Sequence, residues 1–110
     1  MSSQQYNLSL KNGKAMIDGK LVTTNIYVKD ETINLISEKN FESDETIDCK
    51  NLLILPGVID SQVHFREPGL EGKENLESGM LAAVSGGVTA IFEMPNTNPL
   101  TITPETIADK

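Results

Sequence analysis

The hydrophobic pattern changes near Asn51, and this change restricts the fold more than any other feature of the sequence. Before Asn51 apolar and polar residues tend to alternate in short runs, which is typical of half-buried β-strands. After it, the continuous apolar run "LLIL" at residues 52–55 is typical of a strand covered on both faces, as parallel strands are. We therefore predict a β-rich segment over residues 1–51 and a parallel-sheet segment over residues 52–110. The alternating apolar residues are Tyr6, Leu8, Leu10, Ile26, Val28, Ile33, Leu35, Ile47 and Cys49.

Short stretches with turn chemistry separate the predicted strands of the first segment. Asn12-Gly13, Asp18-Gly19 and the charged stretch Lys29-Asp30-Glu31 all suit hairpin turns. We therefore expect a meander of small antiparallel strands, with no long helix between residues 6 and 50. The polar stretch "EKNFESDE" at residues 38–45 is interpreted as a solvated loop or turn without a chemical role.

The second segment contains one strongly predicted helix. Apolar residues recur at helical spacing inside "LESGMLAAVSGG", and predict a helix from about Glu74 to Ser85. Either Asn75 or the pair Lys73-Glu74 can open this helix. Gly86-Gly87 can close it, because glycine tolerates the left-handed conformation that follows many helices.

The elements around this helix complete a repeating order. "VIDSQVHF" at residues 58–65 and "VTAIFEMP" at 88–95 are interpreted as strands, the second of them buried, and "TPETIADK" at 103–110 as the start of a further helix with Thr103 as its N-cap. Strand, loop, helix, strand and helix in this order predict an α/β fold with a parallel sheet, the beginning of a TIM-like β/α barrel. A closed barrel takes roughly 250 residues. Since the pattern also reaches Lys110 without a C-cap, we expect a truncated barrel, with a small free-standing fold of similar order as the alternative.

Composition and charge exclude several classes of function. Nine basic against sixteen acidic residues give a formal net charge of −7, which argues against nucleic acid or an anionic membrane surface as a partner. The single cysteine, Cys49, cannot form an internal disulfide, and its role is left open. The amino terminus has no apolar run of signal-peptide length, and no apolar run anywhere in the sequence is long enough to span a membrane. We therefore expect a cytoplasmic protein.

The only histidine of the chain, His64, stands between Gln62 and Arg66 in "PGVIDSQVHFREPG". In a β-strand alternate residues share a face, so these three side chains would point the same way. In the first strand of a β/α barrel they would lie at the carboxyl end, where active sites are built. Asn96 follows the next strand about one βα repeat later, and we expect it beside His64 at the same rim.

The chemistry of these side chains favours a metal beside a pocket for a small acidic substrate. Histidine offers a nitrogen to zinc, arginine a forked cationic donor that matches a carboxylate, and asparagine an amide. A plainer interpretation stays open, in which Arg66 pairs with Glu67 or Asp60 on the surface and Asn96 forms a turn with Thr97. In that case the lone histidine would be a core residue whose nitrogens are satisfied.

The stretches "HFREPG" and "MPNTNP" at this spacing resemble the amino-terminal part of a dihydroorotase, in the cyclic amidohydrolase group. The resemblance covers residues up to 50 loosely and Leu52 to Thr101 closely. It implies that residues 1–51 belong to a small β-sandwich domain and that residues 52–110 begin a metal-dependent β/α barrel. It also implies a hydrolase acting on a cyclic amide, which interconverts N-carbamoyl-aspartate and dihydroorotate in pyrimidine synthesis.

The same resemblance assigns roles to three residues. His64 matches the second histidine of a His-x-His zinc motif, Arg66 the arginine that grips the substrate carboxylate, and Asn96 the asparagine that assists it. The remaining zinc ligands and an aspartate that acts as acid and base are expected beyond Lys110. We therefore expect residues 1–110 to contain no catalytic residue of their own and to be inactive alone.

Gln62 departs from the motif, because an amide is a poor zinc ligand beside imidazole. Three outcomes stay open: Gln62 binds the metal weakly or through water, the site holds one metal instead of two, or the protein is a non-catalytic partner of aspartate carbamoyltransferase. Arg66 and Asn96 favour the enzyme, since a scaffold needs no substrate clamp. A third function, an independent β-rich binding module, also stays open. The exposed strands at 52–55 and 88–94 would favour pairing with a second copy of the chain.

Overall fold

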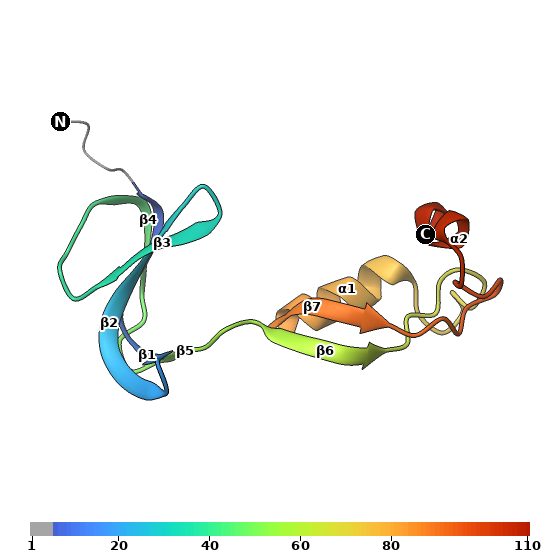
Figure 1. Ribbon diagram of the computed structural model, residues 1–110, viewed down its shortest axis with the longest axis horizontal. Helices are drawn as coiled ribbons and strands as arrows, with labels where there is room; N and C mark the ends of the chain where they lie inside the picture. The colour runs from blue at the N-terminus through green and yellow to red at the C-terminus, as the bar shows by residue number, and fades with distance from the viewer. Residues whose placement is uncertain (1–5) are drawn as a thin grey trace. The chain divides into compact units, whose positions relative to one another are not determined.

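The computed structural model describes residues 6–110 and divides after Leu55 into two units. The first unit, up to Leu55, is a β-sheet, and the second unit, Pro56–Lys110, combines two strands with two helices (Figure 1).

The first unit is built on the long strand β1, Tyr6–Ile17. Antiparallel to it runs β2, Lys20–Lys29, which in turn pairs with β3, Thr32–Ser37. Two short strands pair with β1 in the parallel direction, β4 at Ser43–Asp48 and β5 at Leu53–Ile54. The predicted antiparallel meander is therefore right for β1 to β3 and wrong for β4 and β5. Between residues 6 and 50 the structure has no helix, as the sequence predicts.

Two of the three predicted hairpin turns are present. Asp18 and Gly19 connect β1 to β2, and Asp30 and Glu31 connect β2 to β3. All four residues have positive φ, at 48°, 75°, 49° and 62° respectively. Two successive left-handed residues give the turn whose twist matches the flanking strands, which explains why both connections are tight hairpins.

The third predicted turn, Asn12-Gly13, is instead a bulge inside β1. The register with β2 shifts between Leu10 and Gly13, and Asn12 has φ of 64°. The backbone N–H of Asn12 donates to the Asn25 side-chain oxygen at 2.9 Å, so the residue that leaves the ladder keeps a partner. Asn-Gly fits a bulge as well as a turn, since both need left-handed backbone.

Within the described residues, the run "LLIL" does not form a strand that is buried on both faces. Within this run only Leu53 and Ile54, which form β5, pair with β1, and Leu52, Leu53 and Leu55 are exposed. Ile54 is the residue that packs inward, and it lies where a side chain on Gly13 would stand, 2.4 Å from an ideal Cβ. A continuous apolar run is thus compatible with a short connecting strand as well as with a buried one.

Three aromatic rings organise the core of the first unit. Tyr6 and Tyr27 have ring centroids 4.9 Å apart, and the ring of Phe41 meets that of Tyr27 edge-on at 5.4 Å. Tyr27 is fully buried, and its hydroxyl donates to the Lys39 carbonyl at 2.8 Å and accepts the Phe41 N–H at 3.2 Å. The stretch at residues 38–45 is therefore more than a solvated loop, because the partly exposed ring of Phe41 packs against the two tyrosines and the last residues of the stretch begin β4.

The second unit is a βαβ unit followed by a short helix. Strand β6, Val58–Val63, is parallel to β7, Val88–Glu93, and the two are connected through α1, Leu76–Ser85. Helix α1 lies along the strand pair, as Figure 1 shows. After β7 the chain forms α2, Pro104–Asp109. This order confirms the predicted α/β fold class, a β-rich segment followed by the start of a β/α barrel.

The ends of both helices follow the sequence signals. The Asn75 side chain caps α1 by accepting the Ser78 N–H at 2.8 Å, as expected for a polar residue at this position. Of the two glycines after α1, Gly87 alone has the left-handed conformation, with φ of 83°. Helix α2 begins with Thr103 as N-cap, in a reciprocal capping box with Thr106. None of the helices within residues 6–110 is long and apolar enough to cross a membrane.

The second strand pair is more exposed than its sequence predicts. Phe92 of β7 is 63% exposed and Ile59 of β6 is 61% exposed, although both lie in apolar runs that are typical of covered strands. The other face is covered, since Phe65, just after β6, is only 4% exposed and packs over Gly79 of α1. Within residues 6–110, therefore, helix α1 covers one face of this pair and large apolar side chains remain on the other.

The Tyr27 hydroxyl is expected to stabilise the first unit measurably. Replacing Tyr27 with Phe leaves the Lys39 carbonyl and the Phe41 N–H without that partner, and should lower the free energy of unfolding by about 1 to 3 kcal/mol. Urea unfolding followed by the fluorescence of Tyr6 measures this, because the chain has two tyrosines and no tryptophan. The control Ile33→Val changes an exposed residue of the same sheet and should shift stability by less than about 0.5 kcal/mol. Equal stabilities for the two variants would contradict the assignment.

Candidate functional site

The carboxyl ends of β6 and β7 lie side by side. Val63 pairs with Glu93 in the parallel register, and the Met94 N–H donates to the Val63 carbonyl at 2.8 Å. The two loops that leave these strands, 64–75 and 94–103, therefore start at the same edge of the sheet (Figure 1). In sheets of this kind, the carboxyl edge is where binding sites are built.

A backbone hydrogen bond ties the two loops to each other. The Asn98 N–H donates to the Pro68 carbonyl at 2.9 Å. Beside this bond Gly69 has φ of 86°, and a Cβ placed on it would lie 1.9 Å from the Asn98 carbonyl oxygen. Only glycine combines this conformation with so close an approach. The sequence motifs "HFREPG" and "MPNTNP" are thus in direct contact.

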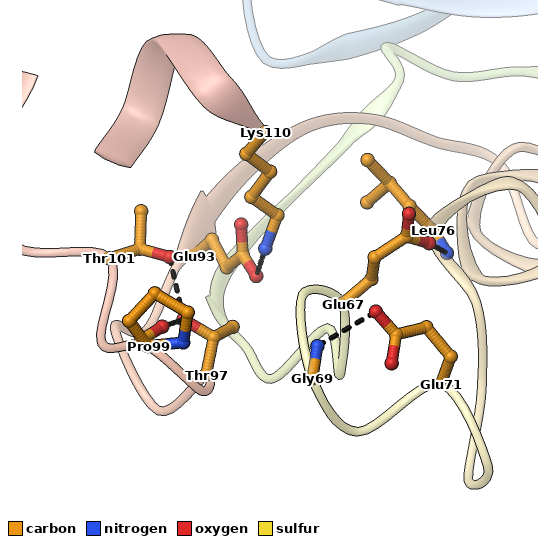
Figure 2. A network of polar contacts seen from close by, with 9 residues as sticks. All are labelled: Glu67, Gly69, Glu71, Leu76, Glu93, Thr97, Pro99, Thr101 and Lys110. Atoms are coloured by element: carbon orange, nitrogen blue, oxygen red, sulfur yellow. Dashed lines mark hydrogen bonds and ion pairs between the residues drawn. The ribbon is translucent and has the colours of Figure 1, made fainter. Parts of the chain in front are cut away.

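The buried residue Thr97, only 5% exposed, stabilises the loop after β7. Its hydroxyl donates to the Pro99 carbonyl at 2.7 Å and lies 2.6 Å from the Thr101 hydroxyl (Figure 2). Because the Thr97 proton is used on Pro99, the Thr101 hydroxyl must donate to Thr97. Two side chains and one carbonyl thereby fix the turn that follows Asn96.

The loop after β6 is held by two carboxylates. Glu67 accepts the Leu76 N–H, the first of helix α1, at 2.7 Å, and Glu71 accepts the Gly69 N–H at 2.7 Å (Figure 2). A carboxylate is favourable at the first turn of a helix, because the N–H groups there are unpaired and the helix dipole is positive. The backbone N–H of Gly69 holds the pKa of the Glu71 carboxyl below its ordinary value.

An ion pair connects the end of β7 to the end of α2. The Lys110 ammonium contacts the Glu93 carboxylate (Figure 2). Glu93 lies beside Val63, the last residue of β6. The elements around the carboxyl edge are thus joined by polar contacts as well as by the sheet.

The four predicted site residues all lie at this edge. Gln62 is the next-to-last residue of β6, whereas His64 and Arg66 follow the strand, so the expected single-strand alignment stops at Val63. The alternation of side chains nevertheless continues, because Gln62 and His64 are exposed and Arg66 is half-buried, while Phe65 is buried. Asn96 is exposed on the neighbouring loop, after β7.

The side chains of these four residues have no hydrogen-bond or ion-pair partner among residues 6–110. The plainer interpretation of Arg66 as one half of a surface ion pair is therefore not what the structure has. Its two expected partners are engaged by backbone instead, Glu67 by the Leu76 N–H and Asp60 by the Gln62 N–H at 3.0 Å. The guanidinium of Arg66 is available to a carboxylate from outside the chain.

A complete metal site is not present in the part of the chain that the structure describes. Residues 6–110 contain no group of three or more His, Cys, Asp and Glu side chains that could hold an ion. A catalytic zinc takes about three protein ligands. His64, the one imidazole of the chain, does not amount to such a site by itself.

Sequence reasoning missed the two residues that shape the loops, Glu67 and Thr97. The sequence suggests Glu67 only as a partner for Arg66, and Thr97 only as part of a turn. The hydrogen bond from Leu76 to Glu67 spans nine positions, beyond the range of the local capping rules. For Thr97, its place between asparagines in "PNTNP" was a weak signal of a turn but gave none of burial.

Comparison with solved structures defines the class of fold. The chain superposes on the L-hydantoinase (dihydropyrimidinase) from Arthrobacter aurescens with a TM-score of 0.82 and 30% sequence identity, covering 94% of this chain and 24% of that one. A D-hydantoinase superposes with a TM-score of 0.70 and 31% identity, over 79% of this chain and 20% of that one. The chain thus shares the fold of the matching part of these amidohydrolases.

Comparison of sequences defines the family. A family model described as "Dihydro-orotase-like" matches residues 51–107, and the chain belongs to this family. It is 42% identical over 97 residues to the dihydroorotase of Pediococcus pentosaceus, covering 87% of this chain and 23% of that protein. It is 47% identical over 97 residues to the dihydroorotase of Bacillus thuringiensis, covering 86% of this chain and 22% of that protein. The chain therefore spans less than a quarter of the length of these relatives, and the resemblance seen in its sequence is confirmed.

Gly69 is expected to be indispensable for the contact between the loops. Replacing Gly69 with Ala puts a methyl group against the Asn98 carbonyl on a left-handed backbone, and should accelerate amide exchange at Asn98 by about tenfold or more. Hydrogen–deuterium exchange monitored by NMR measures this. The control Gly72→Ala lies in the same loop with nothing within 4 Å of its Cβ, and should leave that rate nearly unchanged. An Asn98 amide equally protected in both variants would rule out the close approach.

Proposed function

We propose that this chain is the amino-terminal part of a cytosolic, zinc-dependent cyclic amidase that interconverts N-carbamoyl-aspartate and dihydroorotate. The observation that carries the proposal is the direct contact between the loops that bear Arg66 and Asn96. Membership of the dihydro-orotase-like family supports the same reaction, because relatives of 42% to 47% identity are named dihydroorotases. The substrate is then a small molecule with a carboxylate.

Arg66 and Asn96 are proposed to bind that carboxylate. A guanidinium offers two parallel N–H donors to the two oxygens of a carboxylate, and an amide adds a third donor from the side. Both side chains are without polar partners among residues 6–110, so neither must break an internal contact to bind. Binding by these groups would fix the orientation of the ring, which turns binding free energy into rate.

His64 is proposed as one ligand of the zinc ion, with Gln62 beside it. The other ligands and the residue that acts as acid and base would lie outside these 110 residues. An amide oxygen gives zinc less than an imidazole nitrogen does, so the ion is expected to be held less tightly than in a His-x-His site. Residues 1–110 alone should lack activity, because they contain a single histidine.

A second candidate function is favoured by Gln62 alone. A relative that has lost a metal ligand could keep the fold and serve as a structural partner of aspartate carbamoyltransferase. In that case the carboxyl edge would need no affinity for a carboxylate. Arg66 therefore separates the two candidates better than the metal residues do.

The test of the proposed function is a chimera. The 97 matching residues of the Bacillus thuringiensis dihydroorotase are replaced by those of this chain, and hydrolysis of dihydroorotate is measured. The chimera should be active, and Arg66→Met should raise KM by about 30-fold or more, because a hydrogen-bonded charge pair is lost. The 110-residue chain alone serves as the inactive control.

The matched control for Arg66 is Lys73→Met, which removes an exposed cation from the same loop and should change KM by less than about twofold. A folded but inactive chimera would contradict the enzyme and favour the structural partner. Equal kinetic constants for the two variants would remove Arg66 from the substrate site.

The metal assignment makes a separate prediction in the same chimera. Gln62→His should raise the zinc content per chain and His64→Ala should lower it, because both positions lie at the same strand end. Metal analysis by atomic emission measures both. Lys20→His, which adds an exposed histidine in the first unit, should leave zinc content unchanged. If Gln62→His and His64→Ala both leave it unchanged, this strand end is not a metal platform.

A further inference from the structure

Arg66 stands between two residues that are both anchored to helix α1. Phe65 before it is 4% exposed and packs so closely over Gly79 that an ideal Cβ there would lie 2.7 Å from the ring. Glu67 after it accepts the Leu76 N–H at 2.7 Å. The backbone of Arg66 is therefore held on both sides by one rigid element, although the residue itself lies in a loop.

The anchor at Glu67 continues into the neighbouring loop. Glu67 is followed by Pro68, whose carbonyl accepts the Asn98 N–H at 2.9 Å. Thr97, beside Asn98, is buried and hydrogen-bonded to Pro99 and Thr101. A continuous series of contacts thus runs from the first turn of α1 through Glu67 and Pro68 to the turn after Asn96. Figure 2 shows its two ends, the hydrogen bond from Leu76 to Glu67 and the contacts of Thr97.

The hydrogen bond from Leu76 also engages the Glu67 carboxylate, which therefore does not pair with Arg66. Glu67 is the carboxylate next to Arg66 in the chain, and sequence reasoning made it a candidate ion-pair partner. The structure places its Oε2 on the helix N-terminus, where the N–H and the dipole both favour a negative charge. Arg66 forms no ion pair among residues 6–110, so its charge stays available for a ligand.

We propose that Glu67 is the positioning residue of the carboxylate-binding site, because it fixes Arg66 to helix α1 and couples that loop to the Asn96 loop. This inference rests on the proposed function for the identity of the ligand, whereas the coupling itself concerns only the folded chain. Glu67 touches no reacting group. It acts through the backbone of its two neighbours in the chain, Arg66 and Pro68. The length of the Glu67 side chain matters, because its carboxylate has to reach from the loop to the first N–H of helix α1.

The test uses three variants of the 110-residue chain at Glu67. Glu67→Ala removes the acceptor, Glu67→Asp keeps the charge but shortens its reach, and Glu67→Gln keeps both length and an acceptor oxygen. Amide exchange is measured by NMR at Leu76 and Asn98, and ¹⁵N relaxation at the Arg66 Nε reports the order of its side chain. Glu77→Ala, which removes an exposed carboxylate from the first turn of α1, is the matched control.

We expect Glu67→Ala and Glu67→Asp to speed exchange at Leu76 by about tenfold or more and at Asn98 by several-fold, because no acceptor oxygen then reaches the Leu76 N–H. Both should also lower the order of the Arg66 side chain. Glu67→Gln should restore all three readouts to near the parent values, and Glu77→Ala should leave Asn98 and Arg66 unchanged.

The proposal is overturned if exchange rises at Leu76 alone while Asn98 and Arg66 keep their parent values, since Glu67 is then only a helix cap. If Glu67→Ala does not fold, Glu67→Asp decides by the same criteria. No substrate enters these measurements, so an inactive chimera would refute the proposed function and leave the coupling standing.

Discussion

The parallel pairing of β6 with β7 is the constraint on which the site depends. It brings two loops that are distant in sequence to one edge of a sheet, and the hydrogen bond from Asn98 to Pro68 then joins them. Gly69 makes this possible, because any side chain there would collide with the Asn98 carbonyl. Without this pairing, Arg66 and Asn96 would belong to unrelated loops and could not act on one ligand.

Polar side chains near this edge fall into two groups with different physical roles. The side chains of the first group form hydrogen bonds to backbone groups of the protein itself; they are Asp60, Glu67 and Thr97. Arg66 and Asn96, with the neighbouring histidine and glutamine, have no such partner among residues 6–110. The first group stabilises the end of β6 and the two loops, and the second is the group that we propose to bind a ligand. This separation supports a ligand site more strongly than any single residue does.

Sequence rules predicted the helix caps and the tight turn, which depend on contacts between residues close together in the chain. Asn75 and Thr103 were expected as helix caps, and Asp18-Gly19 as a tight turn, because each needs only its near neighbours. The rules failed where the partner is distant. Asn12-Gly13 is a bulge inside β1 instead of a turn. Strand β5 pairs with β1 in the parallel direction, and Ile54 packs where Gly13 has no side chain.

The candidate site was likewise predictable only in part. The spacing of the two motifs placed their loops at one edge, since a βα repeat returns the chain to the next strand. The hydrogen bonds that fix those loops connect residues far apart in sequence, from Leu76 to Glu67 and from Asn98 to Pro68. Nothing in the identity of a glutamate or a proline indicates such a partner.

The contact between the two loops is the central claim, and a through-hydrogen-bond NMR coupling tests it most directly. The chain labelled with ¹⁵N and ¹³C should show a coupling between the Asn98 nitrogen and the Pro68 carbonyl carbon. A second coupling is expected between the Met94 nitrogen and the Val63 carbonyl, at 2.8 Å in the adjoining sheet, and it serves as the internal reference. If the reference coupling is observed and the Asn98 coupling is absent, the loops are not joined and the two motifs do not form one site.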